Sequence, residues 1–183
     1  KQVVILGAGA AARYVSYILS YDPEMEVVGF TDQDSSKWGA EIHGKPVLGS
    51  DEVLPDLHTK GVRYVVIGVG DPDVRSKLRK LAVDSGFELI NALHPSAIVS
   101  PHVRLGQGVV LEAGAVLSDN PVIDDNVWVG IAAWIAHDTH IGRDSGIGGG
   151  ACVGAEVTVG ERVRVGMGSV IQSGRCIGDD AVV

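Results

Sequence analysis

A histidine and an aspartate stand side by side at His137 and Asp138, within the segment AHDTHIG. A neutral imidazole can take a proton from an amine or a hydroxyl near pH 7. An adjacent carboxylate can fix the tautomer of that imidazole and stabilise the imidazolium that forms. The pair therefore indicates general-base chemistry. An isolated histidine is more often an ordinary surface residue, so this interpretation depends on the structural element that carries the pair.

A second candidate site follows the first apolar segment, where the chain reads KQVVILGAGAAA. Glycines at such a turn let the backbone approach a pyrophosphate at a helix N-terminus, and the pattern resembles the dinucleotide fingerprint with Ala12 in place of its third glycine. Asp32, at the end of the second apolar segment, could accept hydrogen bonds from a ribose. NAD binding is one reading, although about a hundred residues are few for two mononucleotide halves. A tight turn without a ligand is another.

The elements around this turn alternate between strand and helix. We expect strands over Val3–Leu6, over EVVGFTD ending at Asp32, and over VRYVVIGVGD ending at Gly70-Asp71. Helices are expected over residues 11–20 and 74–85, and a short fourth strand over FELINAL. This alternation predicts a small parallel α/β sheet of Rossmann-like type with right-handed crossovers.

From about residue 99 the sequence instead repeats every six residues. Every sixth position from Leu105 to Val183 is Leu, Ile or Val, often followed by Gly, and a small residue usually stands four positions after each aliphatic one. Neither the helical period of 3.6 nor the strand period of 2 explains this spacing. A short strand plus a corner does, with three such units closing one triangular coil whose aliphatic side chains point inward. The run predicts a β-helix of a little over four coils.

Composition limits the classes of function. The chain of 183 residues carries 15 Lys and Arg against 23 Asp and Glu, a formal net charge of −8, which disfavours binding to nucleic acid or to anionic membranes. No apolar run approaches the roughly 20 residues that span a bilayer, and the start does not read as a signal peptide. Two cysteines, Cys152 and Cys176, do not make a disulfide scaffold, so a cytoplasmic location is expected. The chain starts without Met and stops in mid-pattern, so both ends could be cut.

The hexad repeat is similar to the left-handed β-helix of hexapeptide acyltransferases. Together with GAG, GFTDQD, VIGVGD, the junction HPSAIVSP and AHDTHIG, it makes nearly the whole chain resemble the bacterial sugar acetyltransferases that modify UDP-4-amino sugars or sialic acid. The resemblance implies a Rossmann-like sugar-nucleotide-binding domain over residues 1–93 and a β-helix acyltransferase domain over residues 94–183. It also implies a homotrimer with active sites at the subunit interfaces.

By the same resemblance, residues of the amino-terminal turns hold the nucleotide sugar. Gly9, Ala10 and Ala11 would face the phosphates, Asp32 and Gln33 the nucleoside, and the turn from Gly68 through Gly70 to Asp71 would close the pocket. Relatives usually have GGH or SGH where this chain has Ala10-Ala11-Ala12. The sequence therefore does not identify the residues that donate hydrogen bonds to the diphosphate, and Arg13 is one candidate.

In the β-helix the resemblance implies that His137 is the base and that Asp138 orients it. Acetyl-CoA would be the acyl donor, with contacts near Gly146, Ala155 and Met167 from the neighbouring subunit. Relatives commonly have Asn at the position of Gly130 and a second His at that of Gly146, so backbone N–H groups would have to replace those donors.

A tryptophan, three arginines and a second histidine of the repeat are further candidates for binding or for contacts between subunits. Trp134 fits an acceptor pocket or a subunit contact equally. Arg162, Arg164 and Arg175 fit coenzyme phosphates, an interface or plain solvation. We expect His140 to be exposed, and no metal site, because the spacing between His137 and His140 does not match the three-histidine zinc sites of other β-helix proteins.

Three functions remain open from the sequence. The first is N-acetylation of a nucleotide-linked amino sugar with acetyl-CoA, on a route to a bacterial surface glycan. The second is O-acetylation of sialic acid or another sugar hydroxyl. The third is a catalytically weak trimer that binds sugar nucleotides, which the departures at Gly130 and Gly146 make plausible. Retention of His137 and Asp138 favours the two enzymatic functions.

Overall fold

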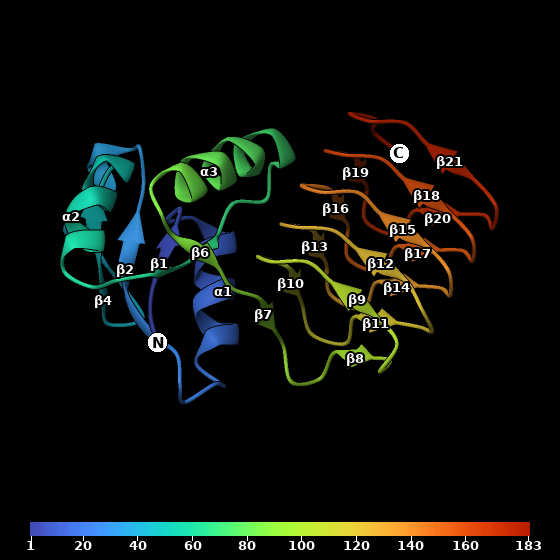
Figure 1. The fold of residues 1–183 in the computed structure, drawn as a ribbon, viewed down its shortest axis with the longest axis horizontal. Coiled ribbons are helices and arrows are strands. Elements are labelled where there is room, and N and C mark those ends of the chain that lie inside the picture. Colours follow the sequence, from blue (N-terminus) through green and yellow to red (C-terminus); the bar gives the residue numbers. More distant parts are fainter.

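The computed structural model describes all 183 residues, Lys1 to Val183. They form an amino-terminal α/β part and a prism of stacked coils packed against it (Figure 1). No helix of the chain is long and apolar enough to cross a membrane.

The amino-terminal part is built on a six-stranded sheet with the order β3-β4-β2-β1-β5-β6. Neighbouring strands are parallel except in the hairpin of β3 and β4. The strands are β1 (Gln2–Leu6), β2 (Glu26–Thr31), β3 (Glu41–Ile42), β4 (Lys45–Gly49), β5 (Tyr64–Ile67) and β6 (Glu88–Leu89). The predicted Rossmann-like sheet is confirmed, and the β3–β4 hairpin is an addition that the sequence reasoning missed.

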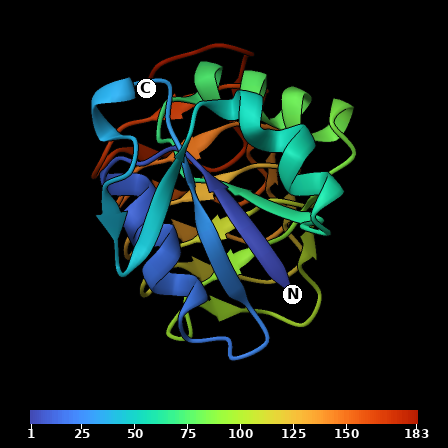
Figure 2. The same ribbon diagram turned by 90° about the vertical axis from the view of Figure 1, so that its left-hand side faces the viewer.

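Helices cover both sides of this sheet (Figure 2). The side chains of β1 alternate between the two sides, as the pleat of a strand requires. Val3 and Ile5 pack in a cluster with α1 (Ala10–Leu19), whereas Val4 and Leu6 pack with residues of α2 (Leu54–Thr59) and α3 (Pro72–Asp84). Short 3-10 turns cover Ser35–Lys37 and Asp51–Val53. Because the strands are parallel, the turns after β1, β2 and β5 meet at one edge of the sheet.

The carboxyl-terminal part is a β-helix with three faces of five parallel strands each. The face toward the amino-terminal part, here called the domain face, holds β7 (Ala92–Leu93), β10 (Val110–Leu111), β13 (Trp128–Val129), β16 (Gly146–Ile147) and β19 (Arg164–Val165). The second face, called the apolar face, holds β8 (Ile98–Val99), β11 (Val116–Leu117), β14 (Trp134–Ile135), β17 (Cys152–Val153) and β20 (Val170–Ile171). The third face, called the polar face, holds β9 (Arg104–Leu105), β12 (Val122–Ile123), β15 (His140–Ile141), β18 (Thr158–Val159) and β21 (Cys176–Ile177).

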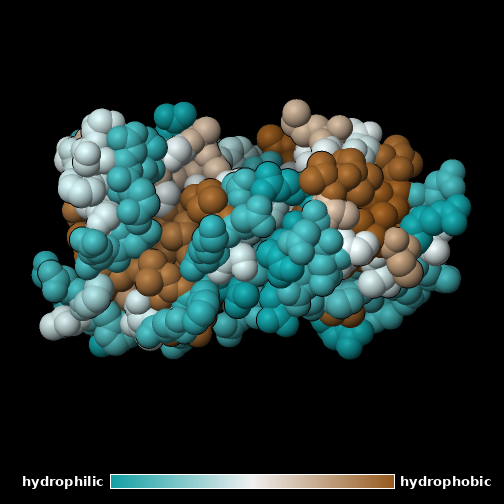
Figure 3. Space-filling view, turned by 90° about the horizontal axis from the view of Figure 1, so that it is seen from above, coloured by the Kyte–Doolittle hydropathy of each residue, from teal (hydrophilic) through white to brown (hydrophobic).

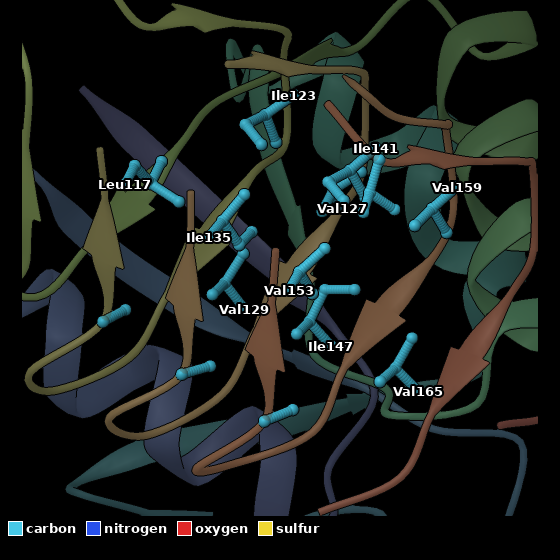
Figure 4. Close-up of a cluster of buried hydrophobic side chains, with 14 of the residues drawn as sticks. Leu117, Ile123, Val127, Val129, Ile135, Ile141, Ile147, Val153, Val159 and Val165 are labelled. Carbon is cyan, nitrogen blue, oxygen red and sulfur yellow. The ribbon is translucent and has the colours of Figure 1, made fainter. Parts of the chain in front are cut away.

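The aliphatic column predicted from the hexads fills the inside of the prism. Leu117, Ile135 and Val153 stack in successive coils of the apolar face and are at most 1% exposed (Figure 4). From Gly108 to Asp180, every corner contains one residue with left-handed backbone, three positions after the inward aliphatic residue. Gly, Asn and Asp fill most of these positions because Gly has no Cβ and because Asn and Asp tolerate positive φ better than other residues do. Asp138, with φ of 55°, is one of them.

The structure lengthens the β-helix relative to the sequence prediction of a little over four coils. The segment FELINAL is split: Glu88–Leu89 joins the amino-terminal sheet, whereas Ala92–Leu93 already pairs with β10. Leu93 and Val99 continue the six-residue column backward, but the turns around them lack the glycine that marks later coils. The boundary proposed between residues 93 and 94 thus falls just after the first strand of the β-helix.

Candidate active site

His137 and Asp138 lie at the corner between the apolar and polar faces, called here the histidine corner. The Nδ1 atom of His137 is 2.9 Å from Oδ2 of Asp138. The other carboxylate oxygen, Oδ1, accepts a hydrogen bond of 2.6 Å from Nδ2 of Asn120, one coil below. Asn120 therefore fixes Asp138, and Asp138 holds the imidazole through Nδ1, which leaves Nε2 free to accept a proton.

Solvent reaches this pair from outside the prism. About half of each side chain is exposed, 53% for His137 and 51% for Asp138. The hydrogen bond from Asn120, followed by that with His137, lowers the pKa of Asp138 below its ordinary value. Asp138 is consequently ionised at neutral pH, the state that the orienting partner of a general base requires.

Two other histidines of the β-helix also contact carboxylates. His102 Nδ1 lies 2.8 Å from Asp119, at the same corner as His137. His140 Nε2 lies 3.0 Å from Asp124 on the polar face, and 46% of its side chain is exposed. His140 is thus half-buried and paired rather than freely exposed as expected, because its outward strand position sets it against the Asp124 corner. No three His, Cys, Asp or Glu side chains are grouped so as to hold a metal ion.

The turn after β1 and the start of α1 present backbone toward open space. Gly9 caps α1 without a side-chain hydrogen bond, and a Cβ added to Gly9 would meet nothing within 4 Å. Ala10 is exposed and Ala11 half-buried, in the first turn of the helix. The free N–H groups of this turn are suited to an anion. Arg13 is exposed in the same segment.

Asp32 joins the loops at this edge of the sheet. Its Oδ2 accepts hydrogen bonds from the Ala8 N–H at 3.0 Å and from Lys37 Nζ at 2.8 Å, and its Oδ1 accepts one from the Asp34 N–H at 2.9 Å. Burial raises the pKa of Asp32, but the bonds from Lys37 and the backbone outweigh burial and lower it overall. Most acceptor positions of this carboxylate are therefore used within the chain, and Oδ1 keeps one acceptor position unused.

Gln33 and Gly68, both predicted to bind the nucleotide sugar, differ in whether the structure leaves them accessible to a ligand. Gln33 is exposed, and its Nε2 donates to Asp51 at 2.7 Å, so its carbonyl oxygen stays free. Gly68 is buried, and a Cβ there would come within 2.6 Å of Ala12 Cα. Gly68 thus lets α1 pack closely on β5. A role for it in direct contact with a ligand finds no support in this packing.

A groove of about 450 Å³ continues from the turn after β5 to the domain face. Its walls come from both parts of the chain: Gly70, Asp71, Pro72, Arg75, Trp128, Gly146, Ile147, Gly148, Arg164 and Val165. Asp71 caps α3 by accepting from the N–H groups of Asp73 and Val74, and its carboxylate lies 2.9 Å from Arg164. Residues predicted for the nucleotide sugar, Gly70 and Asp71, therefore share one groove with Gly146, which was predicted for the coenzyme.

The three residues predicted for the coenzyme do not meet within one chain. Ala155 lies at the histidine corner, one coil above His137. Gly146 lies on the domain face, and Met167 lies at the corner between the domain and apolar faces with 86% of its surface exposed. His137 itself is on the opposite side of the prism from the groove. A single chain thus holds the base and the groove apart.

Sequence reasoning missed several residues of this arrangement. Asn120 was not singled out, although it stands at the left-handed corner position that Asp138 occupies one coil later. Arg75 lines the groove from the first turn of α3, and no local pattern distinguishes it from the solvated cations of that helix. Trp128 lines the groove as well, and its Nε1 donates to Glu112 at 3.1 Å.

Comparison with known proteins decides the family. Residues 2–81 match the model of the PglD N-terminal domain. Over 79 residues the chain is 33% identical to a probable polysaccharide biosynthesis protein, EpsC of Bacillus subtilis, but this match spans 42% of the chain and only 13% of EpsC. Over its whole length the chain is 36% identical to PerB of Caulobacter crescentus, solved with CoA and GDP-perosamine, covering 85% of that protein with a TM-score of 0.93. The chain belongs to the bacterial sugar acetyltransferase family.

A second solved relative agrees with this assignment. The acetyltransferase domain of PglB from Neisseria gonorrhoeae is 29% identical over 97% of the chain and 96% of that domain, with a TM-score of 0.80, and it has also been solved with acetyl coenzyme A. The left-handed β-helix and the Rossmann-like sheet expected from the sequence are therefore the fold of this family member.

The structure gives a physical reason why this sugar acetyltransferase has glycine at position 130, where its relatives commonly have Asn. At Gly130 a Cβ would lie 2.6 Å from the Gly149 nitrogen, so the backbone of the next coil fills the space that a side chain would need. Position 146 is different. A Cβ there would lie 3.7 Å from both terminal nitrogens of Arg75, an ordinary contact, and both Gly146 and Arg75 line the groove.

Proposed function

We propose that this protein transfers an acetyl group from acetyl-CoA to the amino group of a nucleotide-linked sugar, with His137 as general base. The observation that carries the proposal is the His137 imidazole, held through Nδ1 by Asp138 and free at Nε2. The full-length similarity to PerB, solved with CoA and GDP-perosamine, supports the choice of donor and acceptor. Glycan biosynthesis in the cytoplasm remains the expected setting.

The chemistry needs little beyond these groups. The amine nitrogen attacks the thioester carbonyl carbon while Nε2 of His137 takes the amine proton, and the imidazolium is stabilised by ionised Asp138. The carbon–sulfur bond then breaks, the carbonyl re-forms as an amide, and the sulfur of coenzyme A leaves with the proton that the imidazolium returns. Removing the proton during attack matters because a tetrahedral intermediate whose nitrogen kept it would expel the amine again.

We further propose that the active site is completed by a homotrimer. Outward side chains on the apolar face form a stripe, in register from coil to coil: Ile98, Val116, Trp134, Cys152 and Val170. Ile98 and Val170 are 64% and 72% exposed. The space-filling view shows an apolar patch on the β-helix half, and further apolar surface on the amino-terminal half (Figure 3). The outward positions of the polar face, by contrast, include Arg104, His140 and Thr158.

Threefold symmetry about an axis beside the apolar face has a definite consequence. The two corners that flank this face then meet across each subunit interface, the histidine corner of one chain against the Met167 corner of the next. His137 and Ala155 would face Met167 and the groove of the partner. This arrangement brings the predicted coenzyme and substrate residues together, which one chain cannot do alone.

The test measures thiol release from acetyl-CoA with a panel of UDP-, GDP- and TDP-linked 4-amino sugars and free sialic acid. We expect turnover of one nucleotide amino sugar, with a fall of at least about a hundredfold in kcat for His137→Ala, because general-base catalysis contributes on the order of 10²–10⁴. His140→Ala is the matched control, since it removes a histidine paired with a carboxylate on another face.

Other outcomes would replace the proposal. Turnover of sialic acid alone would assign O-acetylation. Binding of a nucleotide sugar without turnover of any acceptor would leave a binding trimer. An equal loss in both histidine variants would remove His137 from its role as the base.

A further inference from the structure

Arg75 is the most deeply buried cation of the chain and lies at the floor of the groove. Its residue is 1% exposed. The guanidinium donates to three backbone carbonyls: Nη1 to Gly70 at 2.8 Å, Nη2 to Asp144 at 2.5 Å and Nε to Asn126 at 3.3 Å. These oxygens belong to the turn after β5 and to two successive coils of the β-helix. One side chain thus joins the groove-lining turn to the prism.

The hydrogen bonds of Arg75 leave donors unused. A guanidinium has five N–H bonds, and three are engaged, so Nη1 and Nη2 keep one each. Both atoms lie 3.7 Å from the position that a Cβ of residue 146 would occupy. Gly146 has no side chain and lines the groove together with Arg75, so the guanidinium, although only 1% of the residue is exposed, borders the groove at this point.

The charge of Arg75 is also the one charge of this groove without a direct counter-ion. Arg164, on the rim, is paired with Asp71 at 2.9 Å and Asp73 at 2.7 Å. The carboxylate of Asp144 is engaged by Arg79 at 2.9 Å and by Asn126 at 2.7 Å, and only its backbone oxygen contacts Arg75. Burial lowers the pKa of Arg75 to about 10, so the guanidinium stays charged at neutral pH.

We propose that the groove beneath α3 is a phosphoryl-binding subsite, with the two remaining N–H groups of Arg75 donating to a diphosphate oxygen of the nucleotide-sugar acceptor. This inference rests on the proposed function. Two sources could supply a phosphoryl group, the acceptor and coenzyme A. The acceptor is favoured because the groove continues directly from Gly70 and Asp71, at the edge of the sheet where the free amides of α1 also lie.

The test uses calorimetric titration of the intact protein with GDP, UDP and coenzyme A. Arg75→Lys keeps the charge but loses the paired donors, and we expect the affinity for the nucleoside diphosphate that binds the wild type to fall at least about tenfold, as for loss of a charged hydrogen bond. Affinity for coenzyme A is expected to change less than about twofold. Arg79→Lys is the matched control, one helical turn along and bonded to the same Asp144, but outside the groove.

A second variant covers the case in which Arg75→Lys fails to fold. Gly146→Ala breaks no hydrogen bond and adds only an ordinary contact at 3.7 Å, yet it places a methyl group over the guanidinium. It should weaken diphosphate binding while the melting temperature stays unchanged.

Equal weakening in Arg75→Lys and Arg79→Lys, or unchanged diphosphate affinity in Gly146→Ala, would overturn the subsite. Loss of coenzyme A binding alone would also overturn it, because the arginine would then serve the donor. These binding measurements do not depend on turnover. They can therefore contradict the phosphoryl subsite while the acetyltransferase assay supports the proposed function, or support the subsite while that assay contradicts the function.

Discussion

At the scale of single residues, the histidine proposed as the base, His137, depends on a neighbour in the coil below. Asn120 donates to Asp138 at 2.6 Å and is the largest cause of the lowered pKa of that carboxylate. The same bond sets the direction in which Asp138 presents its other oxygen to His137. We therefore propose that Asn120 is a positioning residue, which acts on the imidazole through Asp138.

We expect Asn120→Ala to lower kcat about tenfold, because a hydrogen bond to a charged group is worth roughly 1.5–3 kcal/mol. The KM values for both substrates should change less than about twofold, since ground-state binding does not use this bond. Asp138 stays ionised above its lowered pKa, so it adds no limb to the pH–rate profile between about pH 5 and 9. Ser100→Ala, which removes a comparable bond to Asp119 at the same corner, is the control. A change in KM without a change in kcat would contradict this role.

Residue identity alone is misleading for the two glycines after β5, Gly68 and Gly70. Gly68 and Gly70 stand two positions apart, and sequence reasoning gives them one role. In the structure Gly68 is required by the close approach of Ala12, whereas Gly70 opens onto the groove with nothing within 4 Å of its Cβ position. Which glycine serves packing and which serves a ligand depends on the helix that packs nearby, and no local pattern contains that information.

At the scale of elements, the sequence predicts structures that repeat with a fixed period. It does not predict contacts between residues that are far apart in the chain. The six-residue column predicts the inward side chains of the β-helix because one spacing is repeated through every coil. The short hairpin of β3 and β4 has two-residue pairing and no repeating signal, so it escapes the same reasoning. The bonds of α3 to the prism join residues far apart in sequence, such as Arg79 and Asp144, and only the folded chain shows them.

The ion pair between α3 and the β-helix predicts how stability depends on pH. Asp144 is fully buried; burial raises its pKa, but Arg79 and Asn126 lower it below the ordinary value overall. Above the unfolded pKa of about 3.9 the carboxylate stabilises the fold, and this contribution is lost as the pH falls through the lower folded value. We expect Asp144→Asn to cost about 3 kcal/mol at pH 7, as for loss of one partner of a buried pair.

Thermal unfolding of the two proteins from pH 7 down to pH 3 measures this dependence. The difference in melting temperature should be constant from pH 7 to about 5 and shrink below about pH 4. Asp84→Asn is the control, because its pair with Lys80 on the same helix is exposed and contributes little. A difference that persists unchanged at pH 3 would show that packing, not charge, accounts for the effect.

At the scale of the whole molecule, the structure separates His137 from the groove that we propose belongs to the same active site. The groove opens on the domain face, and His137 lies on the opposite side of the prism. A trimer that closes on the apolar stripe resolves this separation, since each histidine corner then meets the groove side of the next chain. In the proposed trimer the order of the faces around the prism, and not any single contact, would make the active site a property of the assembly.

Subunit complementation tests this arrangement directly. His137→Ala removes the base, and Gly70→Trp fills the groove, where Gly70 has open space around it. Each variant alone should be inactive. After the two are mixed, dissociated and reassembled, about a quarter of the interfaces pair an intact histidine corner with an intact groove, so activity should return to about a quarter of the wild-type value. If both halves of the site came from one chain, no mixture would recover activity, because every chain carries one defect.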